Sequence, residues 1–262
     1  MKYLKAFFHL FVVVFLTALT QIGGVIYLIS ILVFRKKKRF KYFFFFGIYL
    51  ACTFFVVPTV APFFGREKIH NSELIQARSV FYTLANRNYV RPEMNVLLSQ
   101  ISSEVIQKHS NVKIVYLDAN FPFFDRFPLL PHLSHNDGKK LDISLVYELD
   151  GNLTHQKPSV SGYGVFEGPK PLEYNQIKKC LARGNWQYDM QKYVTLGTLH
   201  KGLKFSEKGT KALLQSILKQ PTLGKVFIEP HLKYRLGLSH PKIRFHGCQA
   251  VRHDDHIHIQ LK

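Results

Sequence analysis

The sequence predicts an α+β protein in which a small antiparallel sheet with flanking helices is preceded by a two-helix transmembrane hairpin. Two long runs without charge, both within the first 64 residues, predict the hairpin. After them, segments with strand-like alternation and segments with helical spacing of apolar residues follow one another, which predicts the α+β domain. We therefore expect three parts: a two-span anchor (residues 1–64), a helical membrane-proximal segment (65–110) and a folded domain (111–262).

The charge of the chain is unevenly distributed. Lys and Arg number 36 and Asp and Glu number 17, so the formal net charge is +19. Residues 1–64 hold eight basic residues, no acid and 14 of the 23 Phe, which leaves 28 basic and 17 acidic residues, a net charge of +11, in the rest. This distribution excludes a wholly soluble protein, a disordered chain and a disulfide-stapled miniprotein.

The two uncharged runs are long enough to cross a bilayer. Residues 6–34 and 42–64 both exceed the roughly 20 apolar residues that a spanning helix needs. A cleaved signal peptide is the alternative for the first run, because Lys2 and Lys5 precede it, but its apolar stretch is about twice the usual length. A buried core helix is the alternative for both runs, and the acid-free flanks disfavour it.

A basic loop separates the two runs. Residues 35–41 carry six positive charges in seven positions, which the positive-inside rule assigns to the cytoplasm. We therefore expect the chain after Phe64 to lie on the far side of the membrane. A nucleic-acid patch is disfavoured because the loop is held between two spans. Outside the cytoplasm, Cys180 and Cys248 could form a disulfide or remain separate thiols.

The soluble part shows helix, strand and loop patterns in turn. Pro92 suits the first turn of a helix, and apolar residues follow it at helical spacing as far as Val105. A second helix is expected over residues 207–219. Strands are expected at 112–117, 141–149, 226–228 and 257–261. Prolines predict a loop at 120–131, and a composition rich in Gly, Ser and Pro predicts a surface insertion at 151–171.

Histidines are concentrated near the end of the sequence. Of 13 histidines, five fall in the last 23 positions. His256 and His258 are two residues apart on the polar face of the alternating terminal strand, so both side chains can serve one site.

A second polar cluster precedes the strand at 141–149. His135 is followed by a flexible turn at Gly138 and by Asp142 on the non-core face of that strand. Together with the terminal strand this gives zinc ligands of N, N and O type and an open fourth position, the arrangement of catalytic zinc. The alternative for each motif taken singly is an ordinary histidine or a half-exposed strand. His155, His200, His231 and His240 are interpreted in that ordinary way.

The combined pattern is more specific than its parts. His135-x6-Asp142 followed by His256-x-His258 resembles the lysostaphin, D-alanyl-D-alanine metallopeptidase and sonic-hedgehog superfamily. Within it, the chain is most similar to the penicillin-insensitive murein endopeptidases.

Three details carry the closer resemblance. His132 stands three residues before His135, and Gly138 stands three residues after it. The terminal motif His-Asp-Asp-His-x-His occupies residues 253–258. The segment 225–233 looks like the strand and turn that precede this motif. The resemblance covers roughly residues 130–262 and makes residues 111–262 a zinc metallopeptidase-like domain with a zinc cleft.

The resemblance implies a role for each site residue. The three implied zinc ligands are His135, Asp142 and His258. His256 is implied as the base that accepts the proton of the zinc-bound water.

Four further side chains complete the implied site. His132 and His253 would line the cleft and stabilise the oxyanion. Asp254 and Asp255 would orient those imidazoles from behind. Solvated surface acids are the alternative interpretation of the two aspartates.

The expected function is zinc-dependent hydrolysis of peptide cross-links in peptidoglycan by a hydrolase of the murein D,D-endopeptidase type. One alternative is a D-Ala-D-Ala carboxypeptidase in which Arg252 or Lys139 holds the free carboxylate. Another is a non-catalytic, zinc-containing wall-binding domain. The expected partners are peptidoglycan peptide stems and the membrane, with no nucleic acid. The expected location is the bacterial inner membrane, with the domain facing the periplasm or the exterior.

Overall fold

The computed structural model describes residues 2–34, 38–109, 112–200 and 202–262, in two compact units. The first unit comprises residues 1–69, 80–92 and 119–138, and the second comprises 70–79, 93–118 and 139–262. Both helices and strands are present, so the predicted α+β class is confirmed.

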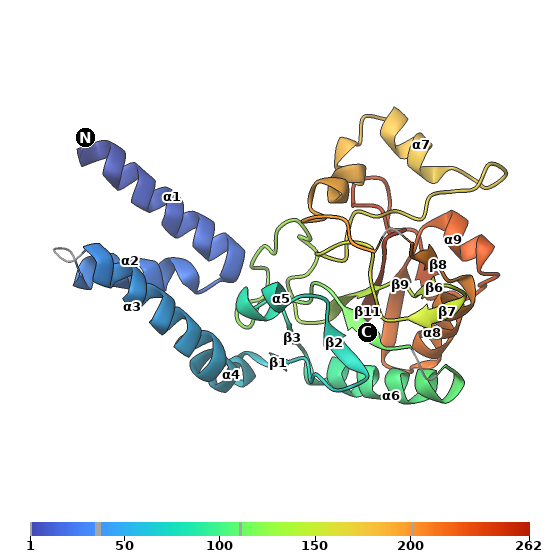
Figure 1. Cartoon of the computed structure of the whole chain (residues 1–262), viewed down its shortest axis with the longest axis horizontal. Helices are drawn as coiled ribbons and strands as arrows, with labels where there is room; N and C mark the ends of the chain where they lie inside the picture. The colour runs from blue at the N-terminus through green and yellow to red at the C-terminus, as the bar shows by residue number, and fades with distance from the viewer. Residues whose placement is uncertain (1, 35–37, 110–111, 201) are drawn as a thin grey trace. The chain divides into compact units, whose positions relative to one another are not determined.

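Apolar helices form most of the first unit (Figure 1). They are α1 (Lys2–Thr20), α2 (Gly23–Val33) and α3 (Lys38–Ala51), the last continued by η1 (Cys52–Val56), α4 (Val57–Val60) and η2 (Ala61–Phe64). Two stretches, Tyr3–Thr20 and Arg39–Phe64, are long and apolar enough to cross a membrane. Of the predicted basic loop, Arg35, Lys36 and Lys37 lie outside the described residues.

The first uncharged run is two helices, not the single span that was predicted. The helix ends at Thr20, and Gln21 has a φ of 68°, in the left-handed region. With 11 residues, α2 is about 17 Å long, too short to cross the hydrocarbon core. A Cβ on Gly24 would lie 1.9 Å from the Thr17 hydroxyl oxygen, so glycine permits the close approach of α2 to α1.

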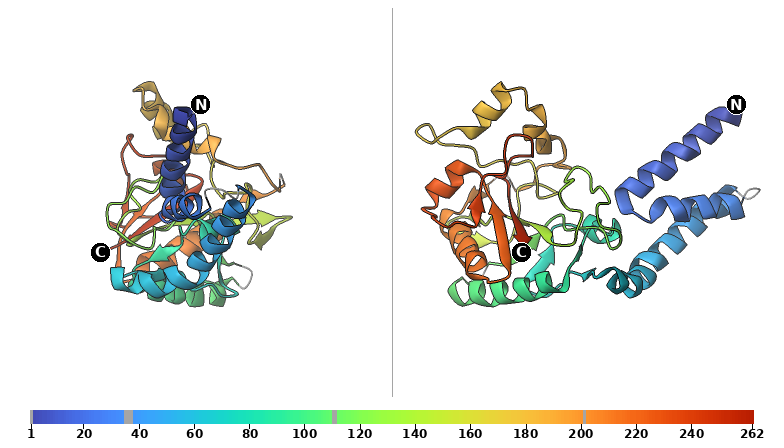
Figure 2. Two further views of the ribbon diagram at one scale, coloured as in Figure 1. Left: turned by 90° about the vertical axis from the view of Figure 1, so that its left-hand side faces the viewer. Right: turned by 180° about the vertical axis from the view of Figure 1, so that it is seen from behind.

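The three helices run up and down. The His9 imidazole contacts the Tyr27 hydroxyl at 2.8 Å, and Gly24 lies against Thr17, so α2 is antiparallel to α1. The Phe34 and Phe44 rings, 4.8 Å apart, join the end of α2 to α3, which turns back in the direction of α1 (Figure 2). The amino end of α1 and the carboxyl end of α2 therefore lie at the same end of this bundle.

Residues 65–91, predicted to be mostly helical, form strands and turns with one short helix. β1 (Glu67–Lys68) pairs with β3 (Tyr89–Val90), and α5 (Val80–Leu84) lies between them in sequence. Helix α6 (Pro92–Lys108) confirms the predicted helix after Pro92. The early strands are only two or three residues long, so their alternation is too short to detect in the sequence.

A six-stranded sheet is the centre of the second unit, and Figure 1 labels its strands β9, β11 and β2. The strand order is β10-β9-β11-β5-β4-β2. The strands are β2 (Ile75–Ala77), β4 (Ile114–Tyr116), β5 (Lys140–Ser144), β9 (Leu223–Phe227), β10 (Ile243–Arg244) and β11 (His256–Leu261). The four central strands are antiparallel, as predicted, but both edge strands are parallel to their neighbours, so the sheet is mixed.

The helices of the second unit include α7 (Gln176–Ala182), η3 (Trp186–Tyr193), α8 (Glu207–Lys219) and α9 (Pro230–Arg235). The predicted helix at 207–219 is confirmed by α8, and the Ser206 hydroxyl caps it by accepting a hydrogen bond from the Gly209 amide. The apolar face of β11 is buried: Ile257 and Ile259 are both 0% exposed.

The predicted strand at 141–149 is divided. β5 ends at Ser144, and β6 (Tyr147–Leu149) belongs to a separate sheet with β7 (Asn152–Thr154) and β8 (Lys204–Phe205). The predicted surface insertion at 151–171 is also partly internal, because Lys157 and Tyr163 are buried. This insertion places the Tyr163 hydroxyl against Asp142.

Candidate metal centre

The pairing of β11 with β5 brings two predicted ligands together. His258 is directly opposite Asp142 in the register of these strands, and residues opposite one another have adjacent side chains. The His258 Nδ1 atom lies 2.8 Å from Asp142 Oδ1. The Phe227 ring, from the strand on the other side of β11, stacks on the His258 imidazole at 5.3 Å. Sheet register therefore fixes the orientation of this pair.

Asp142 has a further partner that the sequence did not reveal. The Tyr163 hydroxyl donates to Asp142 Oδ2 at 2.7 Å, and it accepts a hydrogen bond from the Asp118 amide. Gly162 and Gly164 on either side of Tyr163 both have positive φ, a conformation that favours glycine. These turns bring a residue of the predicted surface insertion against the carboxylate.

Each ring nitrogen of His256 faces a carboxylate. Its Nδ1 lies 2.5 Å from Asp255 Oδ1, and its Nε2 lies 3.6 Å from Asp142 Oδ2. Asp255 also accepts a hydrogen bond from the Gly164 amide, which fixes its position. Burial opposes the imidazolium, but the carboxylates of Asp142 and Asp255 outweigh it and raise the pKa of His256 to about 9. A cation bound by Asp142 would offset part of this negative charge and lower that pKa towards the range of a base.

Among the residues that the structure describes, two groups of three side chains could each hold a metal ion. Each side chain offers one ligand atom, and the ligand atoms of a group lie within 4.8 Å of one another. The first group is His135, Asp142 and His258, all buried. The second group is Glu229, His246 and His253. The first has the three residues predicted as zinc ligands, so a buried His/Asp group able to hold a metal ion is confirmed.

The His135 imidazole contacts the backbone through one of its ring nitrogens. Its Nδ1 lies 2.7 Å from the Ala119 carbonyl oxygen. A carbonyl partner at one imidazole nitrogen fixes the tautomer and presents the other nitrogen as a ligand. The arrangement at His135 is therefore suited to a metal.

The other two predicted site histidines are also buried. The His132 ring lies 5.6 Å from that of His135, and the His253 ring lies 4.6 Å from that of His256. Burial, and then the neighbouring histidines, lower the pKa of His253 well below its ordinary value. The eight predicted site residues are all buried, at most 6% exposed. The structure therefore shows a buried cluster of these side chains and does not show the predicted zinc cleft.

The two aspartates of the terminal motif are buried, not solvated. Asp254 and Asp255 are both 0% exposed, which contradicts the surface-acid alternative. Asp255 contacts the imidazole of His256, whereas the resemblance implied that it orients those of His132 and His253. Asp254 instead accepts from Arg252 Nε at 2.7 Å, and the same guanidinium reaches Asp189 at 2.9 Å. Burial raises the pKa of Asp254 to about 7 in spite of Arg252.

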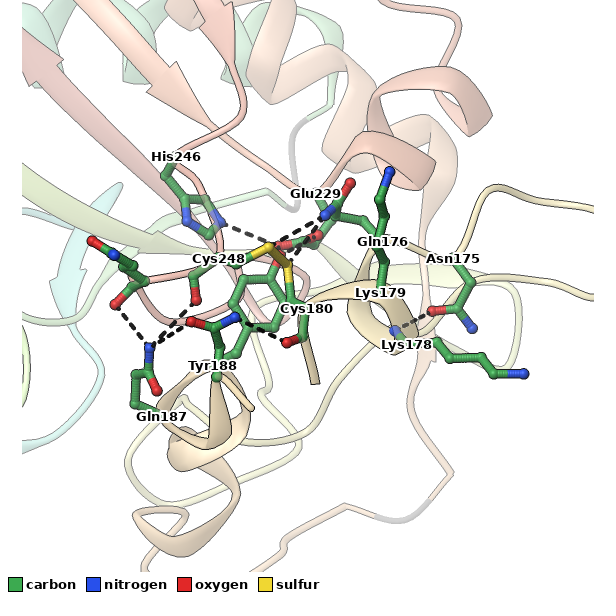
Figure 3. The surroundings of a disulfide bond; sticks show 12 residues. Asn175, Gln176, Lys178, Lys179, Cys180, Gln187, Tyr188, Glu229, His246 and Cys248 are labelled. Carbon is green, nitrogen blue, oxygen red and sulfur yellow. Dashed lines mark hydrogen bonds and ion pairs between the residues drawn. A yellow bond between two sulfur atoms is a disulfide. The ribbon is translucent and has the colours of Figure 1, made fainter. Parts of the chain in front are cut away.

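A disulfide lies beside the second group (Figure 3). Cys180 of α7 is joined to Cys248, which settles the alternative that the sequence left open. Cys248 is two residues after His246, and η3 follows α7, so the disulfide ties the segment of His246 to the segment of Tyr188. Neither Glu229 nor His246 was singled out as a site residue, because neither belongs to the terminal motif.

The chain matches no protein-family model and no curated protein.

Proposed function

We propose that residues 111–262 form a zinc-dependent peptidase that hydrolyses peptide cross-links in peptidoglycan. The observation that carries this proposal is the arrangement around Asp142, which pairs with His258 on one side and faces the Asp255–His256 pair on the other. A metal ligand next to an imidazole that is itself oriented by a carboxylate is the arrangement that metal-assisted hydrolysis needs.

The proposed ligands of the zinc ion are His135, Asp142 and His258. When bound, zinc supplies an acidified water and polarises the scissile carbonyl. Tyr163 holds Asp142 in one orientation through its 2.7 Å hydrogen bond.

His256 is the proposed base. Asp255 binds its Nδ1, so Nε2, the atom that faces Asp142, accepts the proton. As the peptide bond breaks, His256 returns this proton to the leaving amine. His132 and His253 are proposed to stabilise the oxyanion as hydrogen-bond donors.

An endopeptidase is favoured over a carboxypeptidase because the candidate cations are already engaged. Arg252 is 8% exposed, lies over the Phe166 ring at 3.9 Å and is bound by Asp254 and Asp189. The Lys139 ammonium donates to the Lys262 carbonyl oxygen at 2.9 Å. Holding a terminal carboxylate would require one of these cations to leave its partners.

The proposed location is outside the cytoplasm, anchored to a bacterial inner membrane. The Cys180–Cys248 disulfide supports an oxidising compartment. Lys5, near the amino end of α1, would favour the opposite orientation if α1 alone crossed the membrane, but the six basic residues at 35–41 outnumber the two at the amino end of α1. A reporter fused after Lys262 is expected to read as extracytoplasmic, and a cytoplasmic signal would exclude peptidoglycan as the substrate.

Digestion of cross-linked murein by the full-length protein tests the proposed reaction. We expect cross-linked dimers to disappear while pentapeptide stems remain, and a chelator to stop the reaction. Loss of terminal D-Ala from the pentapeptides would identify the carboxypeptidase alternative. Murein binding without hydrolysis in the zinc-loaded protein would identify a non-catalytic wall-binding domain.

A further inference from the structure

Glu229, His246 and His253 form a cluster that the proposed hydrolysis does not need as a unit. Glu229 directly precedes α9, while His246 and His253 belong to the loop between β10 and β11. The His246 and His253 rings are 4.1 Å apart. His246 Nε2 lies 3.2 Å from Glu229 Oε1, and Figure 3 shows these two side chains. The three ligand atoms lie within 4.8 Å of one another.

Glu229 is a buried carboxylate whose neighbours favour its charged form. It is 0% exposed, and although burial opposes ionisation, hydrogen bonds from His246, the His253 amide and Tyr188 lower its pKa. Among the described residues, His246 is the only basic side chain within ion-pair distance of Glu229. Buried charges in proteins are normally paired or coordinate metals. Because an imidazole is not permanently charged, His246 does not give the Glu229 carboxylate a permanent cationic partner.

One ring nitrogen of each of the two histidines makes no hydrogen bond to the described residues. Among the described residues, the Nδ1 atoms of His246 and His253 are buried and have no hydrogen-bond partner. The His246 side chain is 4% exposed and His253 is 5% exposed. Buried polar atoms in native structures normally have partners. Two such nitrogens beside a buried carboxylate point to a ligand that is a cation.

We propose that Glu229, His246 and His253 bind a second divalent metal ion, distinct from the ion of the His135, Asp142 and His258 group. Two imidazoles and one carboxylate are a ligand set that Zn²⁺ takes, whereas Mg²⁺ and Ca²⁺ prefer oxygen ligands throughout.

Neighbouring groups support this second site. The Tyr188 hydroxyl contacts both Glu229 oxygens, at 2.8 and 2.9 Å, and so orients the carboxylate from behind. The Cys180–Cys248 disulfide fixes the segment that carries His246. Binding at this site takes His253 away from the oxyanion, so it makes His132 the remaining histidine for that role.

Metal content of the full-length protein in detergent tests the proposal. The protein is loaded with Zn²⁺, freed of excess ion and measured by elemental analysis, and Co²⁺ loading gives a separate absorption spectrum for each site. We expect two equivalents in the unmodified protein and one in Glu229→Gln, which keeps the shape of the side chain. His246→Ala is expected to behave in the same way, and His240→Ala, from the same region of the chain, is the matched control with two.

Asp142→Asn separates this proposal from the first metal site. It is expected to keep one equivalent, with the Co²⁺ spectrum that Glu229→Gln lacks, and the double variant is expected to bind none. If the unmodified protein binds one equivalent, and Glu229→Gln loses it while Asp142→Asn keeps it, the second site is supported and the first is refuted. If the unmodified protein saturates at one equivalent of metal, and Glu229→Gln and His246→Ala both still bind that equivalent, the second site is overturned.

Discussion

Removal of the Cys180–Cys248 disulfide is expected to destabilise the second unit by about 4 kcal/mol. The two cysteines are 68 residues apart in sequence. Closing a loop in the unfolded chain is worth about 3 kcal/mol for 15 residues and about 4.7 kcal/mol for 100, and 68 residues lie near the upper figure. The perturbation is the double variant Cys180→Ser, Cys248→Ser, which removes the cross-link with little change in volume.

Tryptophan fluorescence in urea measures this loss, because the chain has a single tryptophan. Trp186 begins η3 and is six residues from Cys180, so it reports on the cross-linked segment. With a urea dependence of at most about 3 kcal/mol per molar, the unfolding midpoint should fall by about 1 M or more. Both proteins are compared at full length in the same detergent.

Cys52→Ser is the matched control, since Cys52 is a free cysteine in η1 and should leave the midpoint unchanged. Mass spectrometry establishes that the unmodified sample carries the disulfide. If the double-serine midpoint then lies within about 0.3 M of the unmodified protein, the loop-closure reasoning is wrong for this chain.

Three further predictions concern the first metal centre and a buried lysine. His258→Ala should lose zinc and hydrolysis together, whereas His256→Ala should keep zinc while kcat falls by about 10²–10⁴-fold; the reverse pattern in metal analysis would exchange their roles. Tyr163→Phe should weaken zinc binding by about 10–100-fold, because the donor that orients Asp142 is lost, and an unchanged affinity in chelator competition would refute that role. Lys157 is buried, and burial, with Arg78 as a lesser cause, lowers its pKa to about 7. The unfolded chain therefore holds a proton that the folded chain lacks between about pH 7 and 10.5, so stability should rise with pH across that window. Lys157→Met should remove this rise in urea unfolding, and an identical pH dependence in both proteins would count against the buried neutral amine.

The site was predictable where a short pattern fixes geometry. Alternation over residues 256–261 predicts which side chains share a face, and β11 has that arrangement. Ile257 and Ile259 must enter the apolar core, so a shift of one residue would exchange them with the imidazoles of His256 and His258, which line the site. The position of His258 opposite Asp142 follows from that constraint once β11 pairs with β5.

Contacts made by loops were not predictable in the same way. Tyr163 reaches Asp142 because two glycines adopt positive φ, and glycine-rich composition alone does not distinguish such turns from a solvent-exposed loop. Glu229 and His246 meet through the connections after β9 and β10, which have no periodic pattern. The break at Gln21 was missed because hydropathy records the length of an apolar run and not its backbone path.

The position of β11 in the sheet has a consequence during synthesis of the chain. This strand lies between β5 and β9, yet His258 follows its partner Asp142 by 116 residues. At about 5–20 residues per second, β5 waits about 6–23 s on the ribosome before its neighbour emerges. During that interval one edge of β5 is unpaired, and an unpaired apolar edge invites association with other chains. Association with other chains is therefore expected to be most favourable in the interval before residues 256–261 have been added.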